Sequence, residues 1–249
     1  MCGIVGHVGP VAVPSERSLE VLLDGLSRLE YRGYDSAGVA LLTDEGVSVR
    51  KEAGKLENLR AQIAAHPLAS ATAGIGHTRW ATHGSPTAAN AHPHVAGHIA
   101  LAHNGIIENF RPLREEVESL GRTLLSETDS EVVAHLLDIA YSALREANPA
   151  GDPALQLREA MAQVTPRLEG TYALLAITAD APGTIVAARR SSPLVLGVGE
   201  GENFVGSDVA AFVAFTKQAV EVDDDQIVLI TAAGIEITDA AGQVVTEPH

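Results

Sequence analysis

Short apolar stretches of about five to seven residues recur along the whole chain, with only a few helical patterns between them. Because the two kinds of pattern are mixed throughout rather than separated into halves, we predict one domain in which strands predominate over helices. The chain has 249 residues, 46% of them apolar, which is enough for a sizeable core. The expected strands cover residues 3–8, 37–42, 47–51, 73–78, 99–103, 172–177, 185–188, 194–198, 204–206, 227–230 and 235–238.

Three helices are expected among these strands. Leucines spaced three and four residues apart give residues 15–30 one apolar helical face that should pack against a sheet. A second helix is expected to begin at Thr128, because Thr128 and Glu131 have capping-box spacing ahead of an apolar stripe. The Asn-Pro, Gly and Asp-Pro of residues 148–153 should end that helix, and a third should follow.

The charge balance is acidic, since 32 Asp and Glu against 17 Lys and Arg give a formal charge of −15. Nucleic acids and anionic membranes attract basic surfaces, so neither is expected as a partner. No apolar run approaches the roughly 18 residues of a membrane span, and the first Lys or Arg, Arg17, comes too late for a signal peptide. The single cysteine cannot form an internal disulfide. We therefore expect a soluble cytoplasmic protein.

Cys2 stands at the start of the first expected strand, directly after Met1. Removal of Met1 would leave the thiol beside a free α-amino group, whose pKa of about 7.7 to 8.0 lets it accept a thiol proton near neutral pH. One residue would then supply both a nucleophile and its base. The alternative is an ordinary small residue at the start of a buried strand, and position alone favours that alternative.

The segment at residues 76–84, GHTRWATHG, places polar side chains between a strand and a turn. Arg79 can bind a carboxylate through two parallel hydrogen bonds, and Thr82 and His83 can add polar contacts. The alternative is a surface loop in which Arg79 forms an ordinary salt bridge and Trp80, the only tryptophan, fills a gap in the core. The segment alone does not separate the two readings.

Asn104 and Gly105 follow a strand, where a side-chain amide and an unhindered backbone N–H could stabilise an oxyanion. Asn-Gly is also a frequent turn, and the dipeptide alone favours that interpretation. Asp129 lies at the expected start of the second helix. The helix dipole is enough to explain a carboxylate there, and the alternative is a contact with a substrate ammonium group.

Six of the ten histidines lie between His77 and His103, including His92 and His94 in NAHPH. A metal site is disfavoured, because neither a helical ligand pair nor a group of cysteines accompanies them. The glycines form no phosphate-binding loop of the Walker or Rossmann type. We expect no metal and no cofactor.

Six segments stand in order along the chain: MCGIVG at 1–6, LEYRGYDSAG at 29–38, GHTRWATHG at 76–84, NAHPH at 90–94, HNGIIEN at 103–109 and SETDSE at 126–131. Together they resemble the glutaminase domains of glutamine:fructose-6-phosphate amidotransferases, also called glucosamine-6-phosphate synthases. The resemblance covers essentially the whole chain. It implies an α+β, N-terminal-nucleophile hydrolase fold, a four-layer αββα sandwich with mainly antiparallel sheets, over residues 2–240. Residues 241–249 would form a tail or the start of a linker.

The resemblance also implies roles for named residues. Cys2 would attack the side-chain amide of L-glutamine and form a glutamyl thioester, with its α-amine carrying the proton, while Asn104 and Gly105 stabilise the oxyanion. Arg79 would bind the substrate α-carboxylate, with help from Thr82 and His83, and Asp129 would bind the α-ammonium. Trp80 would gate the passage of ammonia. Arg32 would have a structural or supporting role.

The 249 residues leave no room for the sugar-phosphate isomerase half of such a synthase. We therefore expect the chain to hydrolyse glutamine but to lack fructose 6-phosphate binding and synthase activity. Two alternatives stay open: the glutaminase domain of another amidotransferase with an N-terminal cysteine, and a noncatalytic glutamine-binding module.

Overall fold

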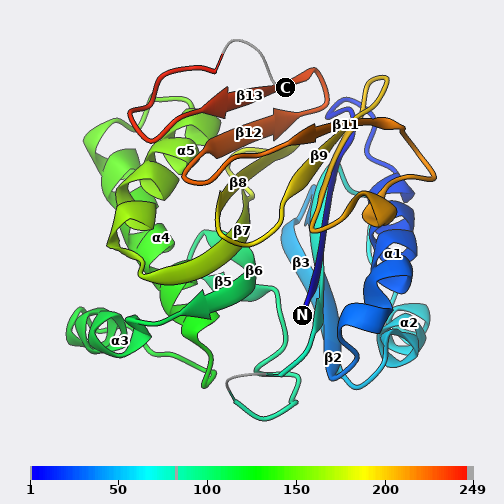
Figure 1. Ribbon diagram of the computed structural model, residues 1–249, viewed down its shortest axis with the longest axis horizontal. Coiled ribbons are helices and arrows are strands. Elements are labelled where there is room, and N and C mark those ends of the chain that lie inside the picture. Colours follow the sequence, from blue (N-terminus) through cyan, green and yellow to red (C-terminus); the bar gives the residue numbers. More distant parts are fainter. Residues whose placement is uncertain (1, 82–83, 246–249) are drawn as a thin grey trace.

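Two antiparallel sheets lie face to face between two layers of helices (Figure 1). The structure is a computed structural model that describes residues 2–81 and 84–245. The four layers expected from the family resemblance are confirmed. The helices within residues 2–81 and 84–245 include none with the length and apolar composition of a membrane span.

The first sheet has seven strands with β1 near its centre, and helices α1 (Arg17–Leu29) and α2 (Leu56–Ala65) pack on its outer face. Every residue of β1 is buried, because β10 and β4 border it on both sides and a layer covers each face. In spatial order the strands are β11 (Gln218–Glu221), β9 (Val195–Val198), β10 (Asn203–Gly206), β1 (Gly3–Val8), β4 (Ala73–Arg79), β2 (Ser36–Thr43) and β3 (Gly46–Ala53).

The second sheet has six strands, and the remaining α-helices cover its outer face. In spatial order the strands are β13 (Gly234–Thr238), β12 (Ile227–Thr231), β8 (Thr184–Arg190), β7 (Gly170–Thr178), β6 (Ile99–Ile107) and β5 (His94–Ala96). The helices are α3 (Phe110–Ser119), α4 (Asp129–Ala147) and α5 (Pro153–Val164), and short 3-10 turns occupy Glu30–Arg32, Thr165–Arg167 and Val209–Ala211.

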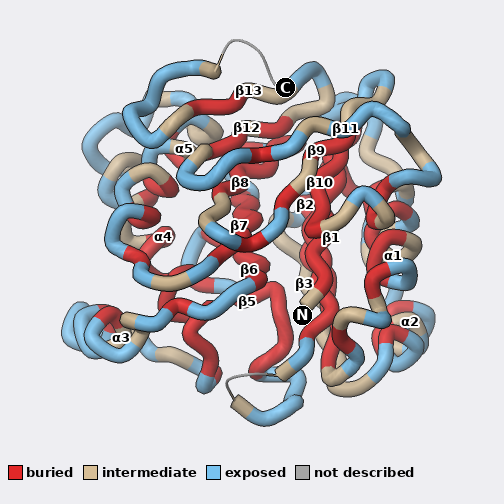
Figure 2. The backbone as a smooth tube through the Cα atoms, in the orientation of Figure 1, coloured by how far each residue is buried: buried red, intermediate tan, exposed pale blue. Residues whose placement is uncertain are grey.

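Three apolar clusters hold the layers together. One lies between the sheets and includes Ile4, Ile75 and Leu175, all fully buried. The other two fill the spaces between each sheet and its helices, around Leu26 and Leu137. In Figure 2 these buried segments are red, along the strands and on the sides of the helices that face the sheets. The sandwich therefore fixes the ends of β1, β4 and β6, which carry the candidate site.

Each strand expected from the sequence has a counterpart in the structure, and so do the three helices. Thr128 caps α4 by accepting the N–H of Glu131 at 3.3 Å, whereas the Glu131 carboxylate accepts the N–H groups of Leu125 and Ser126. Half of the expected capping box is thus present. The elements that were not predicted are β5, β11, α2 and α3, which are short or bury few side chains.

After β13 the chain turns back on itself. The N–H of Val245 donates to the carbonyl of Ile237 at 2.8 Å, and Val245 packs against the cluster between the sheets. The described residues after 240 therefore contact the sandwich, and the expected domain boundary there stays a prediction.

Candidate active site

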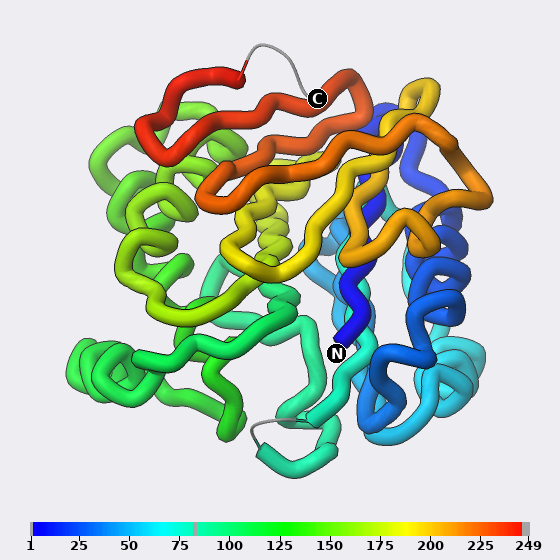
Figure 3. The backbone as a smooth tube through the Cα atoms, in the orientation of Figure 1, coloured from blue at the N-terminus to red at the C-terminus, as the bar shows by residue number. Residues whose placement is uncertain are grey.

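Cys2 lies at the meeting point of three strands. It directly precedes β1, and its Sγ accepts the N–H of Trp80, which follows β4, at 3.2 Å. The side-chain amide of Asn104, in β6, donates to the Cys2 carbonyl at 3.1 Å. In Figure 3 the blue end of the chain accordingly stops beside the cyan segments. The fold thus brings together residues that are about 80 and 100 positions apart in the sequence.

Burial is the largest influence on the pKa of the Cys2 thiol and raises it above its ordinary value. The hydrogen bond with Trp80 and the positive charge of Arg79 oppose this shift, but do not cancel it. At neutral pH the sulfur therefore carries its proton, and a nucleophilic Cys2 needs a proton acceptor.

Asn104 and Gly105 do not form a turn, so the interpretation that the dipeptide favoured is wrong. β6 continues through both residues to Ile107, because its pairing with β7 is unbroken from Ile99↔Thr178 to Ile107↔Gly170. Gly105 has a φ of +131°, and a Cβ at this position would collide with the Thr171 carbonyl. Only glycine permits this close approach of β6 and β7.

We expect Gly105→Ala to lower both stability and any activity of the site. The added methyl group would have to displace the Thr171 backbone at a φ that alanine rarely adopts, at a cost of about 1–3 kcal/mol. The oxyanion-donor role that the family resemblance implies for Gly105 predicts a fall in kcat on the order of 100-fold. Thermal unfolding measures the stability, and steady-state kinetics of the reaction that the family resemblance implies measure the activity. Parent-like values for the Gly105→Ala variant in both measurements would contradict the geometry.

Arg79 and Asp129 line the same small cavity as Cys2, which has a volume of about 20 Å³. Arg79 is only 4% exposed, and its two terminal nitrogens donate to the carbonyls of Ser85 and Gly84 at 3.2 Å. Burial lowers the pKa of Arg79, opposed by negative groups that include Asp129. A buried cation and a buried carboxylate thus face one cavity, as recognition of an amino acid's two α-groups requires.

Asp129 is the first residue of α4 and is 6% exposed. Its Oδ2 accepts the N–H of Ile107 in β6 at 2.8 Å. One carboxylate oxygen therefore ties the helix to the strand that carries Asn104 and Gly105. Thr82 and His83 lie outside the described residues, so their expected contacts stay predictions.

Trp80 lines this cavity and also, together with Cys2 and Gly105, a second and more open one of about 360 Å³. The indole is 46% exposed and packs edge-to-face on Tyr34, with ring centroids 5.7 Å apart. Trp80 therefore does not fill a core gap. Arg32 lines the open cavity and is paired with Asp208 at 2.5 Å, which supports the structural role expected for it.

Sequence reasoning did not assign Asp35 or the turn at 191–193. Asp35 Oδ2 accepts the N–H of Ala81 at 2.9 Å and so fixes the segment beside Trp80. Ser191, Ser192 and Pro193 line the open cavity, and Ser191 has a positive φ of 56°. The sequence signal that could have indicated the contact of Asp35 with Ala81 is its position within the segment YRGYDSAG. No local signal indicated that residues 191–193 line the cavity.

Four of the crowded histidines are buried together behind Cys2. The rings of His77 and His92 stack with centroids 4.2 Å apart, and the rings of His94 and His103 lie 4.6 and 6.4 Å from that of His92. Burial is the main cause that lowers the pKa of all four, to about 3 for His77 and His94. The four rings are therefore neutral at neutral pH. Within residues 2–81 and 84–245, no His, Cys, Asp and Glu side chains are grouped as a metal site requires.

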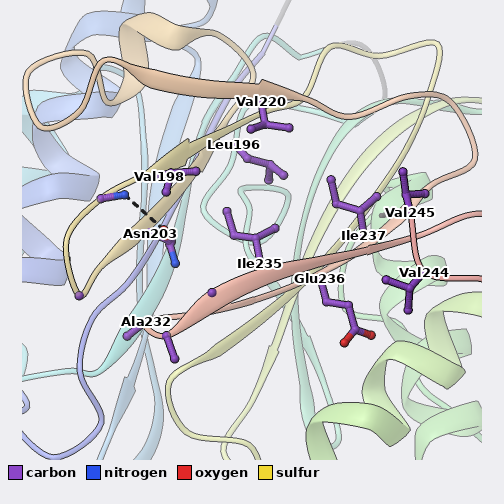
Figure 4. Close-up of a pocket in the computed structure, with 14 residues that line it drawn as sticks. Leu196, Val198, Asn203, Val220, Ala232, Ile235, Glu236, Ile237, Val244 and Val245 are labelled. Atoms are coloured by element: carbon purple, nitrogen blue, oxygen red, sulfur yellow. Dashed lines mark hydrogen bonds between the residues drawn. The ribbon is translucent and has the colours of Figure 1, made fainter. Parts of the chain in front are cut away.

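Another cavity, of about 470 Å³, lies away from Cys2 between the edges of the two sheets (Figure 4). Its lining is mainly aliphatic, with Leu196, Val220 and Ile235 facing it. The single carboxylate there, Glu236, is paired with Arg158. This groove offers apolar packing and no reactive group, so the candidate site remains at Cys2.

A sequence profile described as a glutamine amidotransferase domain matches residues 77–214, which is more than half of the chain. The chain belongs to the glutamine amidotransferase family. The match begins at His77, just before Arg79 and Trp80, and includes Asn104, Gly105 and Asp129.

Curated relatives of this glutamine amidotransferase domain are named glutamine–fructose-6-phosphate aminotransferase (isomerizing). The Streptomyces coelicolor protein is 56% identical over 244 residues, which cover 97% of this chain and 37% of that protein. The Corynebacterium diphtheriae protein is 56% identical over 246 residues, covering 97% of this chain and 38% of that protein. The chain thus spans little more than a third of the length of these relatives and corresponds to their glutamine amidotransferase portion.

Solved structures share the fold of this glutamine amidotransferase domain. Glutamine phosphoribosylpyrophosphate amidotransferase from B. subtilis superposes with a TM-score of 0.75 at 23% identity, covering 98% of this chain and 50% of that one. A structure described as the allosteric regulatory enzyme of purine biosynthesis gives a TM-score of 0.76 at 24% identity, with the same coverage. At these identities the likeness concerns the fold alone.

Proposed function

We propose that the chain hydrolyses L-glutamine to L-glutamate and ammonia through a glutamyl thioester on Cys2. The observation that carries this proposal is the convergence of the Cys2 sulfur, the Asn104 amide and the Gly105 backbone at one cavity edge. A nucleophile beside two kinds of hydrogen-bond donor is the arrangement that acyl transfer requires.

In the first half of the reaction, the free α-amine of Cys2 takes the thiol proton and the sulfur attacks the side-chain amide carbon of glutamine. The resulting oxyanion accepts hydrogen bonds from the Asn104 side chain and the Gly105 N–H. Asn104 has a donor to spare, because a side-chain amide has two N–H groups and only one is needed for the Cys2 carbonyl. The intermediate then breaks its C–N bond, and ammonia leaves with the proton that the amine returns.

In the second half, water attacks the thioester while the same amine accepts its proton. The second tetrahedral intermediate uses the same two donors and then breaks its C–S bond. Glutamate leaves, and the sulfur regains its proton from the amine. Arg79 holds the substrate α-carboxylate and Asp129 its α-ammonium throughout, with Thr82 and His83 adding contacts to the carboxylate.

We further propose that this chain is the ammonia-supplying half of a glucosamine-6-phosphate synthase, with Trp80 at the passage for ammonia. The half-exposed Trp80, which lines both cavities, supports that role. The isolated chain would then hydrolyse glutamine without converting fructose 6-phosphate. A cytoplasmic location stays a prediction.

A noncatalytic glutamine-binding module would bind glutamine and release no glutamate, so a glutamate-release assay separates it from the enzyme. An amidotransferase of another kind would hydrolyse glutamine equally well. It would be separated by testing whether fructose 6-phosphate or another acceptor is aminated when the chain is joined to its partner region.

The substrate clamp can be tested apart from the chemistry. We expect Arg79→Lys to raise KM for glutamine about 10- to 100-fold, because a point charge replaces a planar group with paired donors. Asp129→Asn should raise KM similarly, since it removes the charge that faces the substrate ammonium but keeps an oxygen for the Ile107 N–H. Steady-state glutamate release gives KM and kcat for each variant.

The matched control for the clamp is the substrate itself. Analogues of glutamine that lack the α-carboxylate or the α-amine should be hydrolysed poorly by the parent chain. The analogue without the α-carboxylate should differ little between the parent and Arg79→Lys, and the analogue without the α-amine should differ little between the parent and Asp129→Asn. If simple amides without these groups were hydrolysed as well as glutamine, Arg79 and Asp129 would not form the clamp.

A further inference from the structure

Strand β6 loses its neighbour on one side just before it reaches the candidate site. β5 pairs with it only from Ala96↔Ile99 to His94↔Leu101, whereas β7 borders its other side to Ile107. The backbone N–H groups on the β5 side of β6 are therefore without a strand partner after Leu101. Buried N–H groups need acceptors, so other parts of the chain must supply them.

Successive residues of a strand direct their N–H groups to alternate sides. The N–H of Glu108 donates to the carbonyl of Glu169, which precedes β7. The backbone N–H groups of residues 103, 105 and 107 therefore point the other way, to the side of β6 where β5 has ended. The N–H of His103 donates to Nδ1 of His92 at 3.2 Å, and that of Ile107 to Asp129. No described side chain accepts the Gly105 N–H, which lies between them.

We propose that His92 is a positioning residue for the oxyanion donors, because its imidazole replaces the missing strand at His103 and so aims the N–H of Gly105 two residues later. The inference rests on the proposed glutaminase function. His92 and Asp129 then act as two anchors on one strand edge, one on each side of the single N–H that is left for the substrate.

His92 is itself held firmly. It is 4% exposed, its ring stacks on His77 with an interplanar angle of 14°, and the ring of His94 meets it edge-on at 4.6 Å. Its backbone carbonyl lies so close to Gly38 in β2 that a Cβ at Gly38 would collide with it. Packing from β2, β4 and β5 therefore fixes where Nδ1 lies.

The protonation state of His92 agrees with this role. Burial, followed by the neighbouring imidazoles, holds the pKa of His92 well below its ordinary value. A neutral imidazole keeps a lone pair on one ring nitrogen and can accept a hydrogen bond there, whereas a protonated ring cannot. Nδ1 of His92 is thus available as the acceptor throughout the neutral pH range.

The kinetic test uses three variants of the full chain. His92→Leu removes the acceptor, His92→Asn keeps one at the position of Nδ1, and His92→Gln moves it outward to the position of Nε2. We expect kcat for glutamine hydrolysis to fall about 10- to 100-fold in H92L with KM changed little, because a misaimed oxyanion donor affects the transition state more than the bound substrate. H92N should recover most of the loss and H92Q should not.

Binding of glutamate γ-semialdehyde gives a readout that a merely structural role would not move. The Cys2 sulfur adds to its aldehyde carbon and the thiol proton passes to the oxygen, giving a hemithioacetal whose tetrahedral carbon carries that oxygen in the place of the oxyanion, whereas L-glutamate forms no such bond. Inhibition by the aldehyde should weaken in H92L and H92Q relative to H92N, while inhibition by glutamate stays the same. Equal kcat and equal aldehyde inhibition in H92N and H92Q would overturn the proposal. This comparison does not need H92L, so it holds even if that variant fails to fold.

A nuclear magnetic resonance measurement tests the hydrogen bond without using activity. In the parent chain we expect a nitrogen–nitrogen scalar coupling between the His103 amide and His92 Nδ1. Its absence would overturn the inference. If the coupling is present and H92L keeps full kcat, the positioning role alone is refuted. If the coupling is present and the parent chain, with Met1 removed so that Cys2 is the first residue, releases no glutamate, the proposed function fails instead.

Discussion

Cys2→Ala should slow glutamine hydrolysis by a factor on the order of 10⁴ or more relative to the parent chain, because no other group in the described site can form the proposed thioester. The fold should survive. Cys2 precedes β1 rather than lying within it, and its side chain is only partly buried. Removing one sulfur from such a position costs on the order of 1 kcal/mol or less. Glutamate release and thermal unfolding, measured on the same preparation, separate chemistry from stability.

Cys2→Ser is the matched control for this prediction, because it keeps the shape of the side chain and its contact with the Trp80 N–H. Its hydroxyl is a poorer nucleophile than a thiol at neutral pH, so this variant should also be severely impaired. Turnover by the Cys2→Ala variant comparable to that of the parent would remove Cys2 from the mechanism.

A chain that retains Met1, or carries an uncleavable N-terminal tag, should fold but release glutamate on the order of 10²- to 10⁴-fold more slowly than one that begins at Cys2. The reason lies in the raised pKa of the partly buried Cys2 thiol, which leaves the sulfur protonated at neutral pH. Attachment of Met1 converts the Cys2 amine into an amide nitrogen that cannot accept the thiol proton. The nucleophile would remain, but its base would be gone.

The comparison needs matched samples whose first residue is established by intact mass. Proteolytic exposure of Cys2 should restore activity to a tagged chain, and the same treatment of Cys2→Ala should restore nothing. Equal activity before and after exposure would show that the α-amine is dispensable. Another group would then have to serve as the base; the candidates are His83, which lies outside the described residues, and His103, which lines the same small cavity as Cys2.

Much of the architecture was predictable because it rests on local periodicity. The leucine spacing of α1 and the apolar runs of β1, β4 and β7 are repeated signals, and each gave an element of the correct type. Elements that carry weaker periodicity were missed. β5 has three residues and β11 four mostly exposed ones, so neither contains enough alternation to distinguish it from a loop.

The site was less predictable than the fold, because its geometry depends on contacts between distant segments. Asn104-Gly105 resembles a turn locally, and only its pairing with β7 keeps the dipeptide extended. The stacking of His77 on His92 joins residues 15 positions apart on different segments, which no spacing rule indicates. The family resemblance supplied the residue roles in advance, and those roles stay predictions until they are measured.

Labelling by an electrophilic norleucine analogue of glutamine tests the central claim most directly. The chain, with Cys2 as its first residue, is incubated with 6-diazo-5-oxo-L-norleucine, digested, and mapped by mass spectrometry, with and without excess glutamine. The account predicts one covalent adduct on the Cys2 sulfur, complete loss of glutamate release, and protection by glutamine. An adduct on another residue, or full activity after Cys2 has been labelled, would contradict it.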